Sequence, residues 1–285
     1  MATFGLLFGA TVWGMIWYPY RLLEYAGISG AHASFLTYAI ALVIGLLIFA
    51  RRWRELGRDL PTVLMLALAA GWCNLAYVLA VIDGEVVRVM LLFYLSPLWT
   101  LLLARVLLHE RAGKRGTLII LSSLCGAFIM LWEPAHGFPL PRSVAEWLAL
   151  SAGAAFAVTN VLTRRATQLT LAQKSVAVWG GVAALGLVFL LFSDQPVVGI
   201  SGNHWWLMLV MGALLFVTTL LVQYGVTHTL ATRAAVIFLF ELVVATLFAW
   251  LMANETPSLR ELAGGALIVA ATLFSAVPET RPRSV

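Results

Sequence analysis

Apolar runs recur along the whole chain, separated by short breaks rich in polar and turn-forming residues. Each run has roughly 17–25 residues, enough for a helix to cross a bilayer core of about 30 Å. The clearest breaks are 26–30, 83–85, 133–141, 193–203 and 254–257. The pattern predicts ten helices, at 3–23, 32–50, 62–82, 86–108, 116–132, 145–163, 174–192, 204–224, 232–252 and 262–277.

The composition supports helices that lie in a membrane. The chain is 62% hydrophobic and 11% charged, with a mean hydropathy of +0.95. A soluble domain has about 25% charged residues, so this chain would expose too much apolar surface in water. The longest polar stretches run to about a dozen residues, which leaves no room for a soluble domain. We therefore predict an all-α membrane protein with ten transmembrane helices.

The distribution of Lys and Arg predicts the orientation of these helices. With both termini in the cytoplasm, 13 of the 18 basic residues fall on the cytoplasmic side. Four others, Arg21, Arg88, Arg142 and Arg260, fall at outer ends, and Arg105 lies inside the fourth helix. This bias follows the positive-inside rule. It also accounts for the net charge of +5, so we predict no nucleic-acid partner.

The chain contains a faint internal repeat. When residues 88–127 are moved forward by 145 positions, six residues match, and the charged matches are the informative ones because only 16 of 285 residues are Arg. The matches are Arg88 with Arg233, Phe93 with Phe238, Leu102 with Leu247, Ala104 with Ala249, Glu110 with Glu255 and Arg115 with Arg260. The offset spans five helices, an odd number, so the copies run in opposite directions. We predict two inverted five-helix repeats, residues 1–140 and 141–285.

Several short motifs accompany this layout: Trp13-Gly14, Tyr94-Leu95-Ser96-Pro97, Glu110, the 238–241 stretch ending in Glu241, and Asn254-Glu255. With five plus five helices, the chain resembles the drug/metabolite transporter superfamily and its EamA-type exporters. The resemblance implies a secondary transporter of the bacterial inner membrane, a multi-pass protein that exports a small metabolite such as an amino acid. It also implies a central cavity lined by the first, third, fourth, sixth, eighth and ninth helices.

One position departs from the family pattern. The family commonly has Glu-Pro in the ninth helix, and here Leu242 follows Glu241. The fourth helix keeps Pro97, which removes a helical hydrogen bond and favours a kink. We therefore expect Pro97 to serve as a gating kink, and the ninth helix to bend less than the fourth.

Polar and aromatic residues of the expected cavity helices are the candidates for substrate binding. Aromatic rings can stack on a substrate or hold an ammonium group by cation–π attraction, but they can also simply pack. Amide side chains can bind substrate or bridge helices. The candidates are Trp13, Trp17, Asn74, Tyr77, Tyr94, Trp99, Asn160, Gln223, Tyr224 and Glu241.

Glu241 is the sharpest of these candidates. It lies well inside its predicted helix, 232–252, in which each residue advances the helix by about 1.5 Å. An ionisable group at that depth is a functional hypothesis by default, because an unpaired charge there is costly. Glu241 could bind a substrate ammonium or carry a coupled proton, or it could pair structurally with Arg105.

Other functions remain as alternatives. Exchange of phosphorylated metabolites or nucleotide sugars would need fixed cations in the cavity to meet phosphate. Arg105 is the only basic residue well inside an expected cavity helix, which disfavours this alternative. A non-transporting scaffold or sensor is a second alternative. We predict no enzyme activity, cofactor or metal site, because no catalytic set or phosphate loop is present, and Cys73 and Cys125 fall within apolar runs as buried thiols. We expect a monomer or a weak homodimer.

Overall fold

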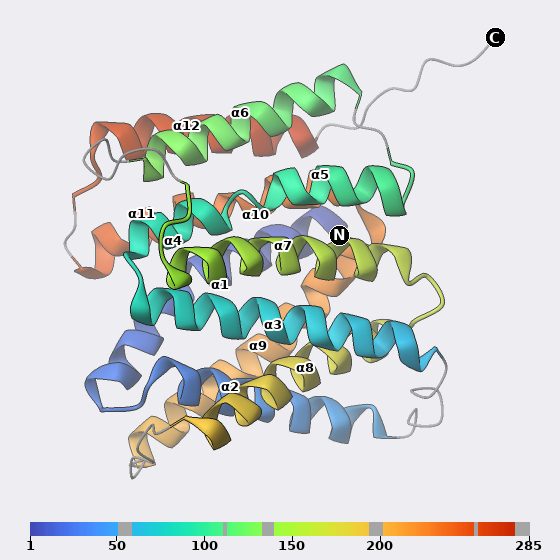
Figure 1. Ribbon diagram of the computed structural model, residues 1–285, viewed down its shortest axis with the longest axis vertical. Helices are drawn as coiled ribbons and strands as arrows, with labels where there is room; N and C mark the ends of the chain where they lie inside the picture. Colours follow the sequence, from blue (N-terminus) through green and yellow to red (C-terminus); the bar gives the residue numbers. More distant parts are fainter. Residues whose placement is uncertain (51–58, 111–112, 133–139, 194–201, 254–255, 277–285) are drawn as a thin grey trace.

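The described part of the chain is entirely helical. The computed structural model describes residues 1–50, 59–110, 113–132, 140–193, 202–253 and 256–276, and these residues form no strand. The helices (Figure 1) are α1 Ala2–Tyr25, α2 Gly30–Ile48, α3 Leu60–Asp83, α4 Val86–Phe93, α5 Ser96–Leu107, α6 Lys114–Leu131, α7 Val144–Arg165, α8 Leu171–Phe192, α9 Gly202–His228, α10 Ala231–Phe238, α11 Phe240–Ala253 and α12 Leu259–Ala276. The ten predicted spans agree with these bounds within a few residues.

The helices have the length and surface of membrane spans. Eight stretches of the described residues are long and apolar enough to cross a membrane, with α4–α5 and α10–α11 each counted as one. The helices α1 and α12 lie outside that set; α12 begins with Arg260 and Glu261. Large apolar side chains such as Phe192 and Leu251 are 89% and 67% exposed. Such surface is stable against lipid and unfavourable in water, so the prediction of a helical membrane protein is confirmed.

Two of the spans are interrupted near their middle. The α4 helix ends at Phe93 and α5 begins at Ser96, with Pro97 in its first turn. Pro97 has no amide hydrogen to donate to the carbonyl of Phe93, which explains this break. The α10–α11 span, which is the predicted ninth helix, is interrupted at Leu239 without any proline. The expectation that this helix is less disrupted than the fourth is therefore not met. Residues 86–93 and 231–238, which form α4 and α10, differ by the 145 positions of the sequence repeat.

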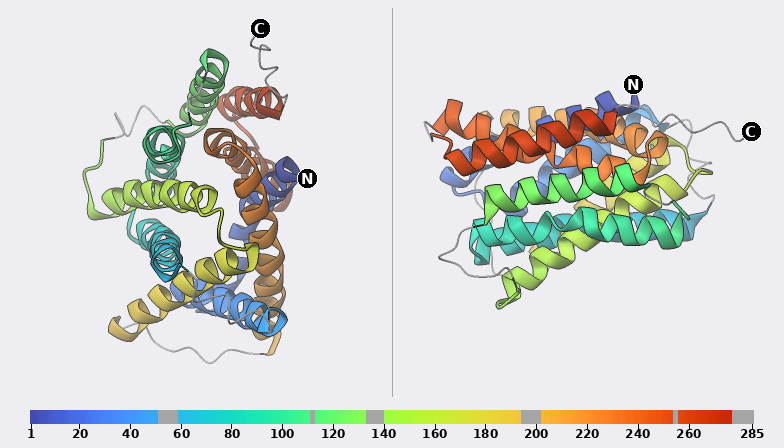
Figure 2. Two further views of the ribbon diagram at one scale, coloured as in Figure 1. Left: turned by 90° about the vertical axis from the view of Figure 1, so that its right-hand side faces the viewer. Right: turned by 90° about the horizontal axis from the view of Figure 1, so that it is seen from above.

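The helices lie side by side across the long axis of the molecule (Figures 1 and 2). The pair α6 and α12 forms one edge, and α2, α8 and α9 form the other. Between them, α7 packs on α3, α4 and α5, while α1 packs on α9 and α11. We call the end where α1 begins and α7 and α9 end the inner end, and the opposite one the outer end. Of the basic residues predicted inside, Arg51, Arg52, Arg54, Arg58, Arg111, Arg281 and Arg283 lie outside the described residues, as does Glu255.

Glycines allow three pairs of helices to pack closely. A Cβ on Gly5 of α1 would lie 2.4 Å from the carbonyl oxygen of Leu221 on α9. In the α6–α12 pair, a Cβ on Gly126 would lie 2.6 Å from the carbonyl oxygen of Gly264. A Cβ on Gly181 of α8 would lie 1.9 Å from the carbonyl oxygen of Ala67 on α3. Small residues replace hydrophobic attraction as the means of helix association in lipid.

We expect Gly181→Ala to destabilise the protein by about 1–3 kcal/mol, because α3 and α8 must separate to admit the methyl group. The neighbouring Gly180 is the matched control, since its Cβ would meet only Leu42, at 3.9 Å. Gly180→Ala should leave the melting temperature unchanged or raise it slightly, because alanine favours the helix. Thermal unfolding of both variants in detergent measures the difference, and equal melting temperatures would contradict this account of α3–α8 packing.

The two cysteines occupy different environments. Cys73 is half-buried on α3, toward the interior. Cys125 is exposed on α6, on the same helical face as the exposed Leu118 and Leu121. The prediction of a buried thiol is therefore wrong for Cys125, because α6 is peripheral and turns this face toward lipid. Both thiols are free.

Candidate functional site

Glu241 lies at the centre of the bundle, in the first turn of α11. The hydroxyl of Tyr94, the residue at the α4–α5 break, lies close to its carboxylate. Cys73 and Tyr77 of α3 lie within electrostatic reach of it. The N-terminus of α11 offers a partial positive charge to the carboxylate. The alternative pair with Arg105 does not form, because Arg105 is exposed on α5 and Glu241 faces tyrosines.

A glycine brings α1 against the backbone of Glu241. A Cβ on Gly14 would lie 2.7 Å from the carbonyl oxygen of Glu241 and 2.9 Å from Cβ of Val244. The close approach places Trp13 and Trp17 beside α11. The ring of Trp17 lies 6.2 Å from that of Phe248, edge on, so α1 supplies one aromatic wall near Glu241.

Aromatic rings from five helices continue this wall, and we call them the aromatic arc. Tyr77 and Phe93 have ring centroids 4.8 Å apart, and Phe93 lies 5.7 Å from Phe156. Phe156 lies 5.3 Å from Phe238, which lies 5.5 Å from Trp13. The arc runs through α3, α4, α7, α10 and α1. Its member Tyr77 lies within electrostatic reach of Glu241.

Three residues of this arc were not predicted from the sequence. Phe93 and Phe238 match one another in the repeat, and each is the last helical residue before a break. That coincidence was the available signal that both rings lie at equivalent central positions. Phe156 carries no such signal, because a phenylalanine in an apolar helix is ordinarily packing.

Two of the predicted site residues serve other contacts. The hydroxyl of Ser34 donates to Oδ1 of Asn74 over 2.6 Å, which bridges α2 and α3. The ring of Tyr224 stacks on His228 at 4.2 Å, toward the inner end of α9. These contacts match the helix-bridging and packing alternatives. Asn74 remains close to the site in sequence, three residues before Tyr77.

Three other predicted residues carry buried polar atoms that have no hydrogen-bond partner within the described ranges. These atoms are Nε1 of Trp99, Nδ2 of Asn160 and Oε1 of Gln223. Asn160 and Gln223 are 5% and 4% exposed. Buried polar groups without partners are rare in proteins, so such atoms are suited to meet a ligand or water. Both amides lie one helical turn further from the inner end than the ion pair described below.

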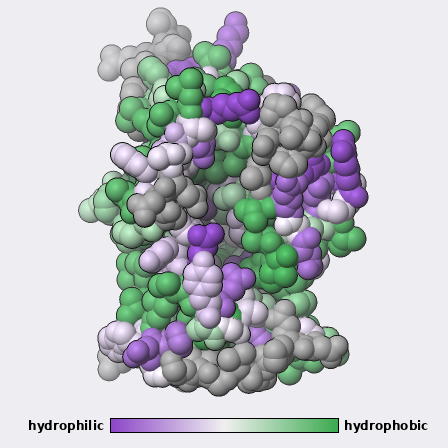
Figure 3. All heavy atoms as spheres, turned by 90° about the vertical axis from the view of Figure 1, so that its left-hand side faces the viewer, coloured by the Kyte–Doolittle hydropathy of each residue, from purple (hydrophilic) through white to green (hydrophobic). Residues whose placement is uncertain are grey.

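The outer end of the molecule is hollowed at its centre. Figure 3 views this end and shows a recess surrounded by a mixed rim of polar and apolar side chains.

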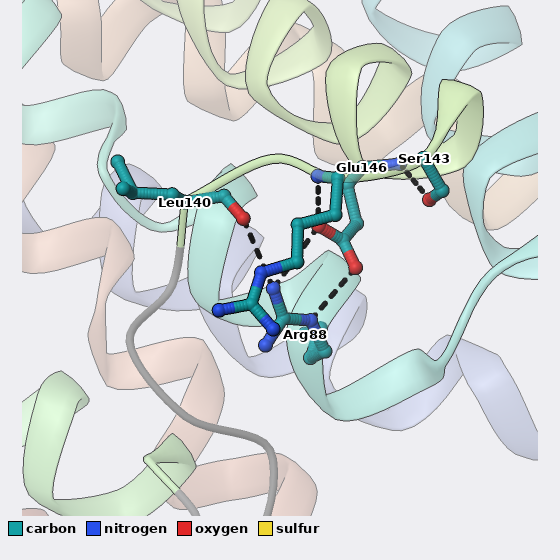
Figure 4. A network of polar contacts seen from close by, with 5 residues as sticks. Arg88, Leu140, Ser143 and Glu146 are labelled. Carbon is teal, nitrogen blue, oxygen red and sulfur yellow. Dashed lines mark hydrogen bonds and ion pairs between the residues drawn. The ribbon is translucent and has the colours of Figure 1, made fainter.

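A buried ion pair joins α4 to α7 at the outer end (Figure 4). Arg88 donates to both carboxylate oxygens of Glu146, over 2.7 and 3.1 Å, and to the carbonyl oxygen of Leu140. The backbone amide of Arg142 donates to Glu146 over 2.7 Å, and Ser143 caps α7. Arg88 and Glu146 are 6% and 7% exposed. Their charges are therefore matched by several charge-assisted hydrogen bonds.

A second ion pair links the two halves of the sequence at the inner end. Nε of Arg164 donates to Glu110 over 3.2 Å, and the amide of Ala231 at the start of α10 donates to the other carboxylate oxygen over 3.0 Å. Arg164 also donates to the carbonyl oxygen of Thr227. Glu110 thus connects the end of α5 to α7, α9 and α10.

A fully buried lysine extends this inner cluster. Nζ of Lys174, on α8, donates to the carbonyl oxygen of Thr163 over 2.8 Å and to Oγ1 of Thr227 over 3.0 Å. Its side chain is completely inaccessible. The sequence analysis missed it, because Lys174 is near the start of a helix placed outside the cavity and was assigned to a cytoplasmic segment.

A smaller contact fixes the inner end of α3. Gln168, in the turn between α7 and α8, donates a side-chain hydrogen bond to Asp59, the residue before α3. This bond and one from Thr62 hold the pKa of Asp59 below its ordinary value. The contact ties the start of α3 to the second half of the chain.

We expect Arg164→Gln to loosen the inner end, because Glu110 loses its cation and the carbonyl of Thr227 loses its charged donor. Hydrogen–deuterium exchange should rise at the start of α10 and at the end of α9. Arg165→Gln is the matched control, since Arg165 is exposed and adjacent. Equal exchange in the two variants would show that the inner ion pair does not hold these helices together.

Comparison with known proteins identifies the family. The profile of the EamA-like transporter family matches residues 1–132 and 143–277. The chain belongs to the EamA-like transporter family. It is therefore a member of a family of membrane transporters, as its resemblance to the superfamily implies.

Individual relatives of this EamA-like transporter are also transporters. The chain is 29% identical to an uncharacterized transporter of Archaeoglobus fulgidus, over 78% of each chain. It is 24% identical to the pseudopaline exporter CntI of Pseudomonas aeruginosa, over 87% of this chain and 86% of that one. It is 26% identical to a riboflavin transporter of Brucella anthropi, over 87% and 88%. A solved crystal structure superimposes with a TM-score of 0.81 at 18% identity, covering 96% of each chain, which shows a shared fold.

Proposed function

We propose that this EamA-like protein is a secondary transporter that exports an amino acid or a related small metabolite across the bacterial inner membrane. One observation carries the proposal. Glu241 is an acidic side chain at the centre of the bundle, beside Tyr94 and the aromatic arc, and its surroundings in the described structure supply no cation. An ammonium group is the ligand that this combination of carboxylate and aromatic faces suits.

The broken helices supply complementary sites for a zwitterion. Both α5 and α11 begin near the centre, and their N-terminal amides carry partial positive charge. Glu241 occupies this position in α11, whereas the position 145 residues earlier holds Ser96, which is neutral. The first turn of α5 and the unpaired Nε1 of Trp99 can therefore receive a substrate carboxylate while Glu241 receives the ammonium.

Alternating access between two inverted repeats, residues 1–140 and 141–285, would move this substrate. The equivalent breaks of α4–α5 and α10–α11 support the repeat, and so do the two stretches matched by the family profile. Pro97 and Leu239 mark the points where each repeat can bend. The recess at the outer end supports an outward-facing state (Figure 3).

The orientation follows from the positive charges, with both termini in the cytoplasm and α1 and α12 completing ten spans. Energy would come from the substrate gradient or from a coupled proton carried by Glu241. Facilitated diffusion or loose proton coupling suits one central acid better than strict exchange of several protons. We propose that the protein acts as a monomer or a weak homodimer.

The second transport function, exchange of phosphorylated metabolites or nucleotide sugars, needs cations that are free to meet phosphate. Three cations of the described structure are already engaged: Arg88 by Glu146, Arg164 by Glu110, and Lys174 by backbone and hydroxyl oxygens. Arg105 is exposed. These contacts favour a substrate that brings its own positive charge.

Flux measurements in proteoliposomes test the proposal. We expect efflux of one or more labelled amino acids from a panel, above empty liposomes, and a modest change when a pH gradient is imposed. Flux of phosphorylated compounds alone would support the second transport function. Absence of flux for both groups would support a scaffold or sensor and contradict the proposal.

A further inference from the structure

Three helices meet at the inner end, away from the central site. Ile120 of α6, Val236 of α10 and Ala271 of α12 pack into one apolar cluster. One turn closer to the inner end, α6 presents Arg115 and α10 presents Arg233. The apolar cluster therefore forms the floor of a junction that carries two arginines.

Neither arginine is neutralised by an acid of the described structure. Arg115 donates one bond, from Nη2 to the carbonyl oxygen of Phe274 on α12, over 3.2 Å. Nε of Arg233 is buried and has no hydrogen-bond partner among the described residues. The two guanidinium groups lie within electrostatic reach of one another. Glu110, which bonds the start of α10 near Arg233, is already engaged by Arg164 and by the amide of Ala231.

The counterpart of Arg233 in the other copy of the repeat has an acidic partner. Arg88 is the counterpart of Arg233 at an offset of 145, and Glu146 neutralises it with two hydrogen bonds. The counterpart of Glu146 at the same offset is Met1, which has no carboxylate. In the first copy of the repeat, Glu146 therefore neutralises Arg88. In the second copy, Arg233 and Arg115 have no such anion among the described residues.

We propose that Arg115 and Arg233 bind the phosphate of an anionic phospholipid at the junction of α6, α10 and α12. The arginines lie at the end that we propose faces the cytoplasm, level with lipid headgroups. Exposed apolar side chains descend from the junction along α6 and α12, where acyl chains can lie. They are Leu118, Leu121, Leu273 and Phe274, which are 66%, 56%, 64% and 61% exposed. Headgroup and acyl contacts together distinguish a lipid from a free phosphate.

Lipid competition on the full-length protein tests this site. Native mass spectrometry after exchange into equal mixtures of phosphatidylglycerol and phosphatidylcholine should show preferential retention of phosphatidylglycerol. Arg233→Gln and Arg115→Gln should each reduce that preference about fivefold, the equivalent of about 1 kcal/mol per basic residue. Arg165→Gln, which removes an exposed inner-end charge elsewhere, should leave the preference unchanged.

Three outcomes would overturn the proposal. The first is an equal preference in wild type, Arg233→Gln and Arg165→Gln. The second is displacement of the lipid by inorganic phosphate at matched ionic strength, which would identify a soluble anion as the ligand. The third concerns Glu279, which lies outside the described residues. The melting temperatures of Glu279→Gln and Arg233→Gln would be compared in each of the two lipids. If both substitutions lower the melting temperature equally, the partner of Arg233 is the carboxylate of Glu279 and not a lipid phosphate.

Discussion

Replacing Glu241 by Gln should reduce amino-acid flux about 10- to 100-fold while leaving the protein folded. The amide is nearly isosteric, but it cannot form a charge-assisted bond to an ammonium group. Such a bond contributes about 1.5–3 kcal/mol, which corresponds to the expected loss. Initial rates of labelled amino-acid efflux from proteoliposomes, at matched protein incorporation, measure the effect. The variant should also lose any dependence of flux on the pH gradient.

Glu24→Gln is the control for this experiment, because Glu24 is an exposed acid on α1 at the outer end. It removes the same charge without touching the aromatic arc, and its flux should match wild type. Unchanged flux and unchanged pH dependence in Glu241→Gln would exclude both the ammonium site and the proton role. A melting temperature well below wild type would instead assign Glu241 a structural role.

Breaking the ion pair at the outer end should produce the largest loss of stability. Removing one partner of a buried ion pair costs about 3–5 kcal/mol, since the other charge is left without compensation. Glu146→Leu strands the guanidinium of Arg88, and Arg88→Met strands the carboxylate of Glu146. Each variant should lower the melting temperature by on the order of 10 °C for a chain of this size.

The double variant Arg88→Met/Glu146→Leu should recover most of that loss, because two apolar side chains can replace a buried pair at little cost. Arg142→Ala is the control: its backbone amide, which donates to Glu146, is retained. Its melting temperature should stay near that of wild type. If the two single losses simply added in the double variant, Arg88 and Glu146 would not be coupled.

Much of the fold could be predicted from the sequence, because membrane helices are recognisable as long, continuous apolar segments. The ten apolar runs correspond to the helices found, and the sequence repeat anticipated equivalent positions such as Phe93 and Phe238. The break at Leu239 could not be predicted, since no proline or glycine marks it. It lies where the packing of Tyr94 against Leu239 and Leu242 brings two broken spans together.

Of the candidate site, Glu241 could be predicted from the sequence, whereas the aromatic arc could be predicted only in part. Depth alone pointed to Glu241, because acids are costly in a membrane. The aromatic arc depends on which faces of five helices converge, and single-helix patterns do not contain that information. Lys174 was missed for a related reason: its partners Thr163 and Thr227 come from neighbouring helices, and only their packing shows that the ammonium is buried.

Counterflow with matched pairs of compounds tests most directly whether Glu241 binds the ammonium of the substrate. Proteoliposomes loaded with an active amino acid would be challenged from outside with that amino acid or with the same molecule lacking its amino group. We predict exchange with the amino acid, at least tenfold weaker exchange with the deaminated analogue, and loss of this discrimination in Glu241→Gln. Equal exchange with both compounds in the wild-type protein would contradict the account.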